Sequence, residues 1–251
     1  MKILSIGNSF SQDAQDFLHQ TLENVGVENR VMNLYIGGCS LEAHWRNLTN
    51  NADVYEEEVN GKPTGNKVSI AQALVADDWD VITLQQCSSD SGWLDAYEPF
   101  FGDLYAFARE KCPKAKFYIH KTWAYDEGCE VSSFPRYHLD PKEMYERLSY
   151  AYGTISEKYA LPMIPSGDVV QALRYTPPFQ PHKDAPLSIT RDGFHMHYLY
   201  GRYAVALTWT KVLTGHAATE NTYVPVSDYC EDKADEAILK LVREVVDKIV
   251  Q

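Results

Sequence analysis

Three residues at opposite ends of the chain have the types needed for nucleophilic catalysis. Ser9 lies in the stretch Ile6-Gly7-Asn8-Ser9-Phe10-Ser11, whereas Asp192 and His195 lie in Arg191-Asp192-Gly193-Phe194-His195. A serine hydroxyl is unreactive at its own pKa and requires an adjacent base. Histidine can be that base, and a carboxylate can hold its tautomer and stabilise its charged form. Together, the three side chains predict a Ser-His-Asp triad.

Ser9 falls between a predicted strand and a predicted helix. The apolar run Lys2 to Ile6 has strand length, and Gly26 ends a helical pattern of apolar residues: Ala14, Phe17, Leu18, Leu22 and Val25. Ligands of open α/β sheets bind at the carboxyl ends of strands, and free N–H groups at a helix start favour an oxyanion. The alternative is that Asn8 and Ser9 only cap the helix, as these residues commonly do.

Further polar or glycine-rich turns follow the next predicted strands. Gly37-Gly38 follows the strand Asn29 to Leu34, and two glycines let the backbone approach a ligand closely. Gln85-Gln86 follows Asp80 to Leu84, the clearest buried strand. These turns are therefore expected at the same sheet edge as Ser9.

Histidines and aromatic residues near these turns are weaker candidates. His44 and His120 are either pocket residues or buried histidines. An aromatic ring beside a site can stack on a sugar, although core and loop packing is its commoner role. The aromatic candidates are Trp123, Trp45, Tyr125 and Trp93, with Trp123 the first choice.

The order of these motifs resembles the SGNH (GDSL-like) hydrolase superfamily, over nearly the whole chain. The opening block matches Gly7 to Ser11, the glycine block matches Gly37-Gly38, and the Asp-x-x-His block matches Asp192 to His195. Within the superfamily, the chain is most similar to a group of uncharacterised bacterial proteins with a Gly-Asn-Ser-Phe-Ser opening. The resemblance implies a serine esterase that removes a small acyl group, such as acetyl, from a carbohydrate.

The same resemblance implies an oxyanion hole built from the backbone N–H groups of Ser9 and Gly38. The superfamily's third donor is usually an asparagine side chain after the third strand, where this chain has Gln85-Gln86. A glutamine carries the same amide on a longer arm, so Gln86, or less readily Gln85, is expected to replace it. The alternative is that both glutamines satisfy loop backbone groups.

Strands that alternate with helices predict one α/β domain over residues 1–251. We expect a three-layer α/β/α sandwich with a five-stranded parallel sheet of flavodoxin-like strand order. Tyr55 to Ser69 carries Asn60-Gly61 and alternates in polarity, so we expect a small peripheral β-hairpin there. Helices are predicted for Leu41 to Leu48, Tyr97 to Cys112, Pro141 to about Tyr159, Asp168 to Tyr175, Tyr198 to Leu213 and Lys233 to Val250.

Composition narrows the class of partner. The net charge is −12 over 251 residues, which argues against a nucleic-acid or anionic-membrane partner. No run approaches the roughly 20 apolar residues of a membrane span. No signal peptide is evident, so the expected location is cytoplasmic, or periplasmic or secreted if a signal was removed. Five scattered cysteines are expected to be reduced thiols.

Two other functions compete with the serine esterase. A noncatalytic glycan-binding module on the same scaffold would share the fold. A metal-dependent hydrolase would use Asp192, His195 and His197, although no fourth ligand is evident. The first interpretation needs no metal or cofactor, and its partner is a small-molecule or glycan ester. The oligomeric state does not follow from the sequence.

Overall fold

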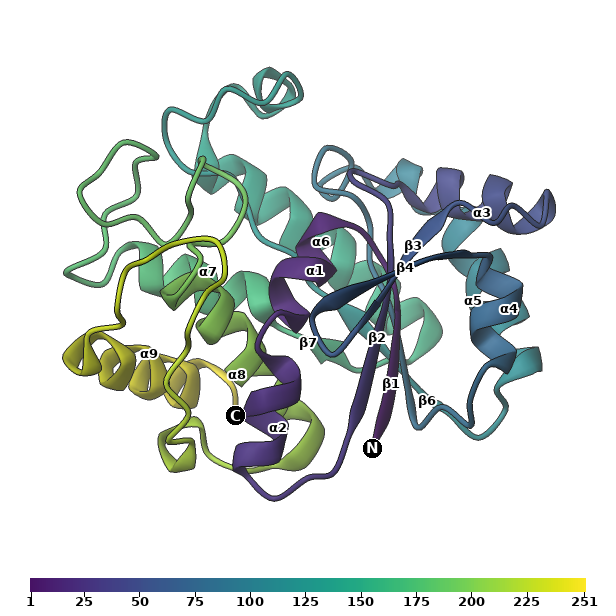
Figure 1. Ribbon diagram of the computed structural model, residues 1–251. Helices are drawn as coiled ribbons and strands as arrows, with labels where there is room; N and C mark the ends of the chain where they lie inside the picture. The colour runs from purple at the N-terminus through teal and green to yellow at the C-terminus, as the bar shows by residue number, and fades with distance from the viewer.

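The computed structural model describes all 251 residues and contains one mixed sheet of seven strands, in the order β4-β3-β2-β1-β5-β6-β7. The sheet stands between two layers of helices (Figure 1). An unbroken hydrophobic core extends from Ile3 on the first strand to Val250 after the last helix. No helix is both long and apolar enough for a bilayer crossing.

The parallel part of the sheet runs β2-β1-β5-β6-β7. Short, almost fully buried strands form it, as expected for a sheet covered on both faces. Their bounds are β1 (Lys2–Ile6), β2 (Arg30–Tyr35), β5 (Val81–Leu84), β6 (Lys116–His120) and β7 (Met163–Ile164). Because neighbouring strands are parallel, their carboxyl ends lie at one edge.

The helices that follow these strands form the two outer layers. One layer contains α1 (Ser9–Gln15), α2 (Leu18–Asn24), α7 (Ser166–Arg174), α8 (Tyr200–Thr214) and α9 (Glu236–Ile249). The other contains α3 (Leu41–Thr49), α4 (Ile70–Val75) and α5 (Phe100–Lys111) (Figure 1). The longest helix, α6 (Pro141–Tyr159), packs Tyr159 on Phe101 of α5 with ring centroids 5.1 Å apart. Short 3₁₀ turns are η1 (Leu94–Ala96), η2 (Phe134–Tyr137) and η3 (Ala218–Glu220).

The predicted hairpin is present but belongs to the main sheet, which therefore has seven strands, five of them parallel, and not five strands with a separate hairpin. β3 (Tyr55–Val59) pairs antiparallel with β2, and β4 (Lys62–Val68) pairs with β3. Tyr55 is fully buried, and the buried Glu58 accepts a hydrogen bond from Asn33 of β2. Glu57 and Glu58 of β3 have partners within the sheet, which the alternation of residue types did not reveal. Only β4, an exposed edge strand, is peripheral.

The helix predicted after Ser9 is also interrupted. Asp16 and Phe17 separate α1 from α2, and α1 has only seven residues. The apolar spacing is continuous across this break, which explains why one helix was predicted. All five cysteines are free, and four of them are buried.

Candidate active site

Ser9 is the first residue of α1, directly after the turn that follows β1. The preceding Asn8 caps the helix, and its side-chain oxygen accepts the Phe10 N–H at 3.0 Å. Gly7 is required here because a Cβ atom at this position would lie 2.1 Å from the Ser11 hydroxyl. Ser9 itself is half-buried, and its hydroxyl makes no hydrogen bond within the protein. The cap is therefore Asn8, which leaves the Ser9 side chain without a structural partner.

Asp192 and His195 form a hydrogen-bonded pair on a tight loop. The Asp192 Oδ2 atom lies 2.7 Å from His195 Nδ1, and its Oδ1 atom accepts the His195 backbone N–H at 2.7 Å. Burial opposes ionisation of Asp192, but the hydrogen bonds from His195 outweigh it, and the pKa of the carboxyl is lowered. His195 Nε2 makes no hydrogen bond within the protein. The pair thus presents one free ring nitrogen.

The expected hydrogen bond between Ser9 and His195 is absent. Phe10, the residue after Ser9, lies edge-on to the His195 ring with centroids 6.1 Å apart, so the two segments are close neighbours. Hydrogen bonds between catalytic groups are often long in unliganded sites and tighten only around the substrate. The structure therefore brings the serine turn and the histidine together without joining them.

A buried carboxylate on the serine's own helix holds the histidine loop. Asp13 is fully buried, and its Oδ2 atom accepts the Met196 N–H at 2.8 Å. Its Oδ1 atom accepts from Arg191 at 3.0 Å and from Arg202 Nε at 2.8 Å. Arg191 and Met196 flank the segment 192–195 on either side. The Asp13 carboxylate consequently sets where His195 stands relative to Ser9.

Trp123 holds the same loop from the other side, in a role that differs from the predicted one. Its ring is fully buried and stacks on Phe10 with centroids 4.2 Å apart. Its Nε1–H donates to the Phe194 carbonyl at 2.7 Å, while the Asp126 N–H donates to the Gly193 carbonyl at 2.7 Å. Trp123 has no face available for a sugar, because its position after β6 directs it into the core.

Gly38 contributes backbone groups at the same edge of the sheet. It follows β2 and adopts a φ of +64°, a left-handed conformation that favours glycine. Its N–H has no acceptor within the protein. As the first residue of α1, Ser9 likewise has no acceptor for its N–H inside the helix. Two backbone N–H groups without protein acceptors thereby follow β1 and β2 at the carboxyl edge of the sheet.

The Gln86 amide already has partners for its oxygen and for one of its two N–H bonds. Its side-chain oxygen accepts from Leu41 N at 3.0 Å and from Cys87 N at 2.8 Å, and its Nε2 group donates to the Ala96 carbonyl at 2.9 Å. The residue is buried and joins the loops that follow β2 and β5. This arrangement agrees with the alternative interpretation of the sequence, in which the glutamine amides form hydrogen bonds with backbone groups of the loops.

Gln85 belongs to a buried chain of hydrogen bonds, and a backbone carbonyl at one end determines which group donates in each bond. Asn8 Nδ2 donates to the Cys39 carbonyl at 3.1 Å, so its Oδ1 atom must accept, and Gln85 Nε2 donates to it at 2.8 Å. The Gln85 oxygen therefore accepts from His120 Nδ1 at 2.6 Å, and His120 Nε2 accepts from Ser166 at 3.0 Å. Burial lowers the pKa of His120 to about 3, which suits a neutral ring. Both Gln85 and His120 are buried.

His44 is likewise a core residue and not a substrate contact. It is fully buried on α3, and its Nδ1 atom lies 2.8 Å from the Tyr55 hydroxyl. Burial lowers its pKa to about 3. The neighbouring thiol of Cys39 and that of Cys87 are buried, and burial raises their pKa values to about 12 and about 11. Both thiols are therefore protonated at neutral pH and are poor nucleophiles.

His197, the second histidine of the metal-dependent alternative, does not join the Asp192–His195 pair. Its Nδ1 atom accepts the Leu199 N–H at 3.2 Å, and its ring stacks on Tyr200. No group of three or more histidine, cysteine, aspartate or glutamate side chains is arranged to hold a metal ion.

Sequence reasoning missed two residues that organise this site, Asn8 and Asp13. Asn8 was considered only as a cap, although it also joins the loops after β2 and β5. Asp13 lies four residues after Ser9, one helical turn along, which was a usable signal. The apolar periodicity of this helix does not distinguish a buried carboxylate from an exposed one.

A family model described as a domain of unknown function, DUF4886, matches residues 2–238. The chain belongs to this family. A crystal structure of a DUF4886 family protein from Bacteroides uniformis is 32% identical in sequence, with a TM-score of 0.89, 99% of this chain covered and 93% of that one. No curated protein matches the chain.

More distant solved structures share the fold of this DUF4886 protein. A candidate SGNH hydrolase from Slackia heliotrinireducens is 22% identical, with a TM-score of 0.58 and coverage of 85% of this chain and 98% of that one. An acetyl xylan esterase is 14% identical, with a TM-score of 0.58 and coverage of 85% and 100%. At these identities the likeness shows an SGNH-like fold.

Proposed function

We propose that the protein is a serine ester hydrolase of SGNH type that removes a small acyl group, such as acetyl, from a carbohydrate or a similar ester. The observation that carries the proposal is the Asp192–His195 pair, which leaves Nε2 free on a loop held by the helix of Ser9. The fold shared with an acetyl xylan esterase supports the class of reaction and of substrate.

In the proposed mechanism, Ser9 is the nucleophile and His195 moves the proton. His195 Nε2 takes the hydroxyl proton as Ser9 Oγ attacks the acyl carbon, and the imidazolium then gives this proton to the leaving alkoxide. Water, deprotonated by the same nitrogen, releases the acid from the acyl-enzyme. Asp192 holds the proton on Nδ1 and stabilises the imidazolium.

The N–H groups of Ser9 and Gly38 stabilise the oxyanion of the tetrahedral intermediate. Such donors are effective when they already point to the place where charge develops. Gln86 is part of this proposal only as a support: its amide holds the backbone after β2, on which Gly38 lies.

The test is hydrolysis of 4-nitrophenyl acetate by the Ser9→Ala variant beside the parent, together with fluorophosphonate labelling. We expect the variant to lose at least about 10³-fold in kcat and all labelling. Ser132→Ala, which changes an exposed serine, is the matched control and should behave as the parent. Equal turnover by Ser9→Ala and parent would reject the serine mechanism; glycan binding without turnover by the parent would favour a binding module.

A further inference from the structure

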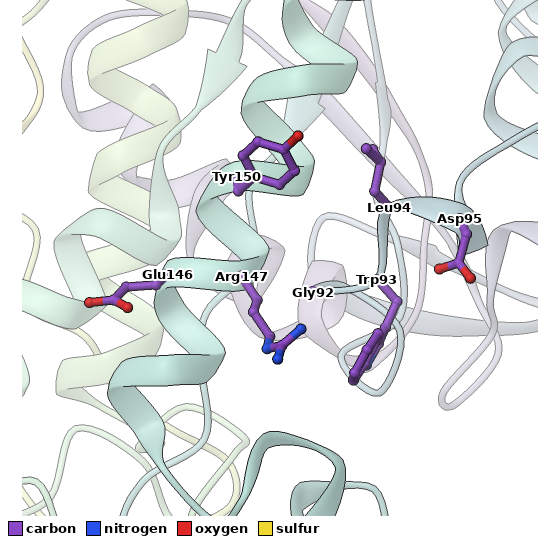
Figure 2. Close-up of a pocket in the computed structure, with 7 residues that line it drawn as sticks. All are labelled: Gly92, Trp93, Leu94, Asp95, Glu146, Arg147 and Tyr150. Atoms are coloured by element: carbon purple, nitrogen blue, oxygen red, sulfur yellow. The ribbon is translucent and has the colours of Figure 1, made fainter.

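A large surface cavity lies between the loop after β5 and helix α6. Its volume is about 720 Å³, and it is lined by Gly92, Trp93, Leu94, Asp95, Glu146, Arg147 and Tyr150. In Figure 2, Tyr150 and Arg147 of α6 face Leu94 and Trp93 across the gap, whereas Glu146 and Asp95 point to either side. The cavity is a wide depression that is open to solvent, and its volume is within the range of small-molecule sites.

The cavity offers an aromatic surface and hydrogen-bond donors without a net positive charge. The Tyr150 side chain is unusually open for an aromatic residue, with 69% of its surface exposed, and its hydroxyl has no partner. Arg147 lies over the Trp93 ring at 4.9 Å and is paired through Nε with Glu143 at 2.8 Å. The terminal amino groups of Arg147 are unpaired. Because Glu143 balances its charge, Arg147 suits a neutral hydroxyl better than a carboxylate.

The loop that forms one wall of the cavity begins at the candidate active site. Gln85, at its start, bonds to Asn8 beside Ser9. Further along, Ser88 accepts a hydrogen bond from Tyr125, whose ring packs edge-on against Phe194, the neighbour of His195. The loop reaches the cavity at Gly92. At no more than about 3.5 Å per residue, the seven residues from Gln85 to Gly92 span less than about 25 Å, and the turns between them shorten this.

The loop is also held rigidly, as a wall of a binding site must be. The Tyr137 hydroxyl accepts the Gly92 N–H at 3.1 Å and donates to the Ser89 carbonyl at 3.1 Å. Arg136 donates a hydrogen bond to Asp90 at 2.7 Å. Its guanidinium also lies over the ring of Trp93, a residue of the same wall, 4.8 Å from the ring centroid. The position of the wall relative to Ser9 is therefore built into the fold.

From these observations we infer that the cavity binds an uncharged sugar of an oligosaccharide substrate. This sugar is separated by several residues of the oligosaccharide from the sugar whose ester lies at Ser9. Tyr150 provides the ring on which the apolar face of the sugar packs, and the Arg147 amino groups donate to its hydroxyls. This inference rests on the proposed function and adds the substrate class: a neutral oligosaccharide ester of several units.

The experiment compares Tyr150→Ala with the parent on two substrates, O-acetylated xylohexaose and 4-nitrophenyl acetate. We expect kcat/KM on the oligosaccharide to fall about tenfold, mainly through KM, with no change on 4-nitrophenyl acetate. Tyr175→Ala is the matched control, because Tyr175 is an exposed tyrosine, 53% open, at the end of α7 and outside the cavity. It should behave as the parent on both substrates.

Other outcomes overturn the inference while leaving the serine mechanism intact. These are equal kinetics of Tyr150→Ala and Tyr175→Ala on the oligosaccharide, or a parent that prefers an acetylated monosaccharide. A stronger preference for acetylated oligogalacturonate would reject the neutral sugar. Failure of the proposed function is distinguishable, because then Ser9→Ala would still hydrolyse 4-nitrophenyl acetate.

Discussion

The Met196 N–H donates to the Asp13 carboxylate at 2.8 Å, and this contact joins the helix of Ser9 to the loop of His195 across 183 residues of chain. The same carboxylate accepts from Arg191, on the other side of the loop. A buried carboxylate on the helix of Ser9 therefore helps to fix the separation of two groups that must meet during catalysis. A misplacement of about 1 Å can cost about 10²-fold in rate.

Asp13→Asn should lower kcat for ester hydrolysis by at least tenfold, even at temperatures where the variant is fully folded. It should also lose about 3 kcal/mol of unfolding free energy, because a buried ion pair is broken. Asp16→Asn is the control: Asp16 pairs with Arg202 at 3.0 Å but does not contact the histidine loop. Loss of stability in both variants, with equal loss of kcat, would show that Asp13 has only a structural role.

Asp192→Ala should reduce kcat less than Ser9→Ala or His195→Ala, which should lose comparable, large factors because the two act as a unit. Without Asp192, water can still partly hold the His195 ring. Turnover of 4-nitrophenyl acetate by the three purified variants is the measurement. An Asp192→Ala variant as inactive as Ser9→Ala would mean that the carboxylate does more than orient the ring.

Acid should destabilise the protein through two buried histidines. The pKa values of His44 and His120 are lowered by burial to about 3, from 6.5 in the unfolded chain. Between these values the unfolded state binds protons that the native state does not. The histidines' contribution to stability is hence complete above pH 6.5 and is lost as pH falls toward 3, by about 1.4 kcal/mol per pH unit for each histidine.

Urea unfolding between pH 7 and pH 4 measures the slope of the unfolding free energy against pH. His44→Asn and His120→Asn should each be less stable than the parent at pH 7, yet flatter in their pH dependence. An unchanged slope in both buried-site variants would contradict the assignment.

Deletion of residues 55–69 should abolish cooperative unfolding. β3 covers the edge of β2, and it contributes the buried Tyr55 and the Glu58 carboxylate that pairs with Asn33. Thr64→Ala, on exposed β4, should leave the melting temperature nearly unchanged. A cooperative melt of the deletion variant near the parent's temperature would show that β3 is dispensable.

Local patterns were enough to predict most of the parallel sheet and the long helices. β1 occupies Lys2–Ile6 and α6 occupies Pro141–Tyr159, as the sequence predicts. Short buried strands are continuous apolar runs, and the Asp140-Pro141 pair marks a helix start, because these signals depend only on neighbouring residues. The same local signals placed Ser9, Gly38 and Gln86 after strands, and therefore at one edge.

Tertiary structure alone decided what the polar side chains do. Gln86 and Trp123 both follow strands, but Leu41 and Phe194, to which they form hydrogen bonds, are distant in the chain. In the sheet, Glu58 of β3 accepts from Asn33 of β2, and the His195 loop is held by Asp13. A sequence shows which groups can form hydrogen bonds, whereas the fold determines which are already satisfied and which remain free for chemistry.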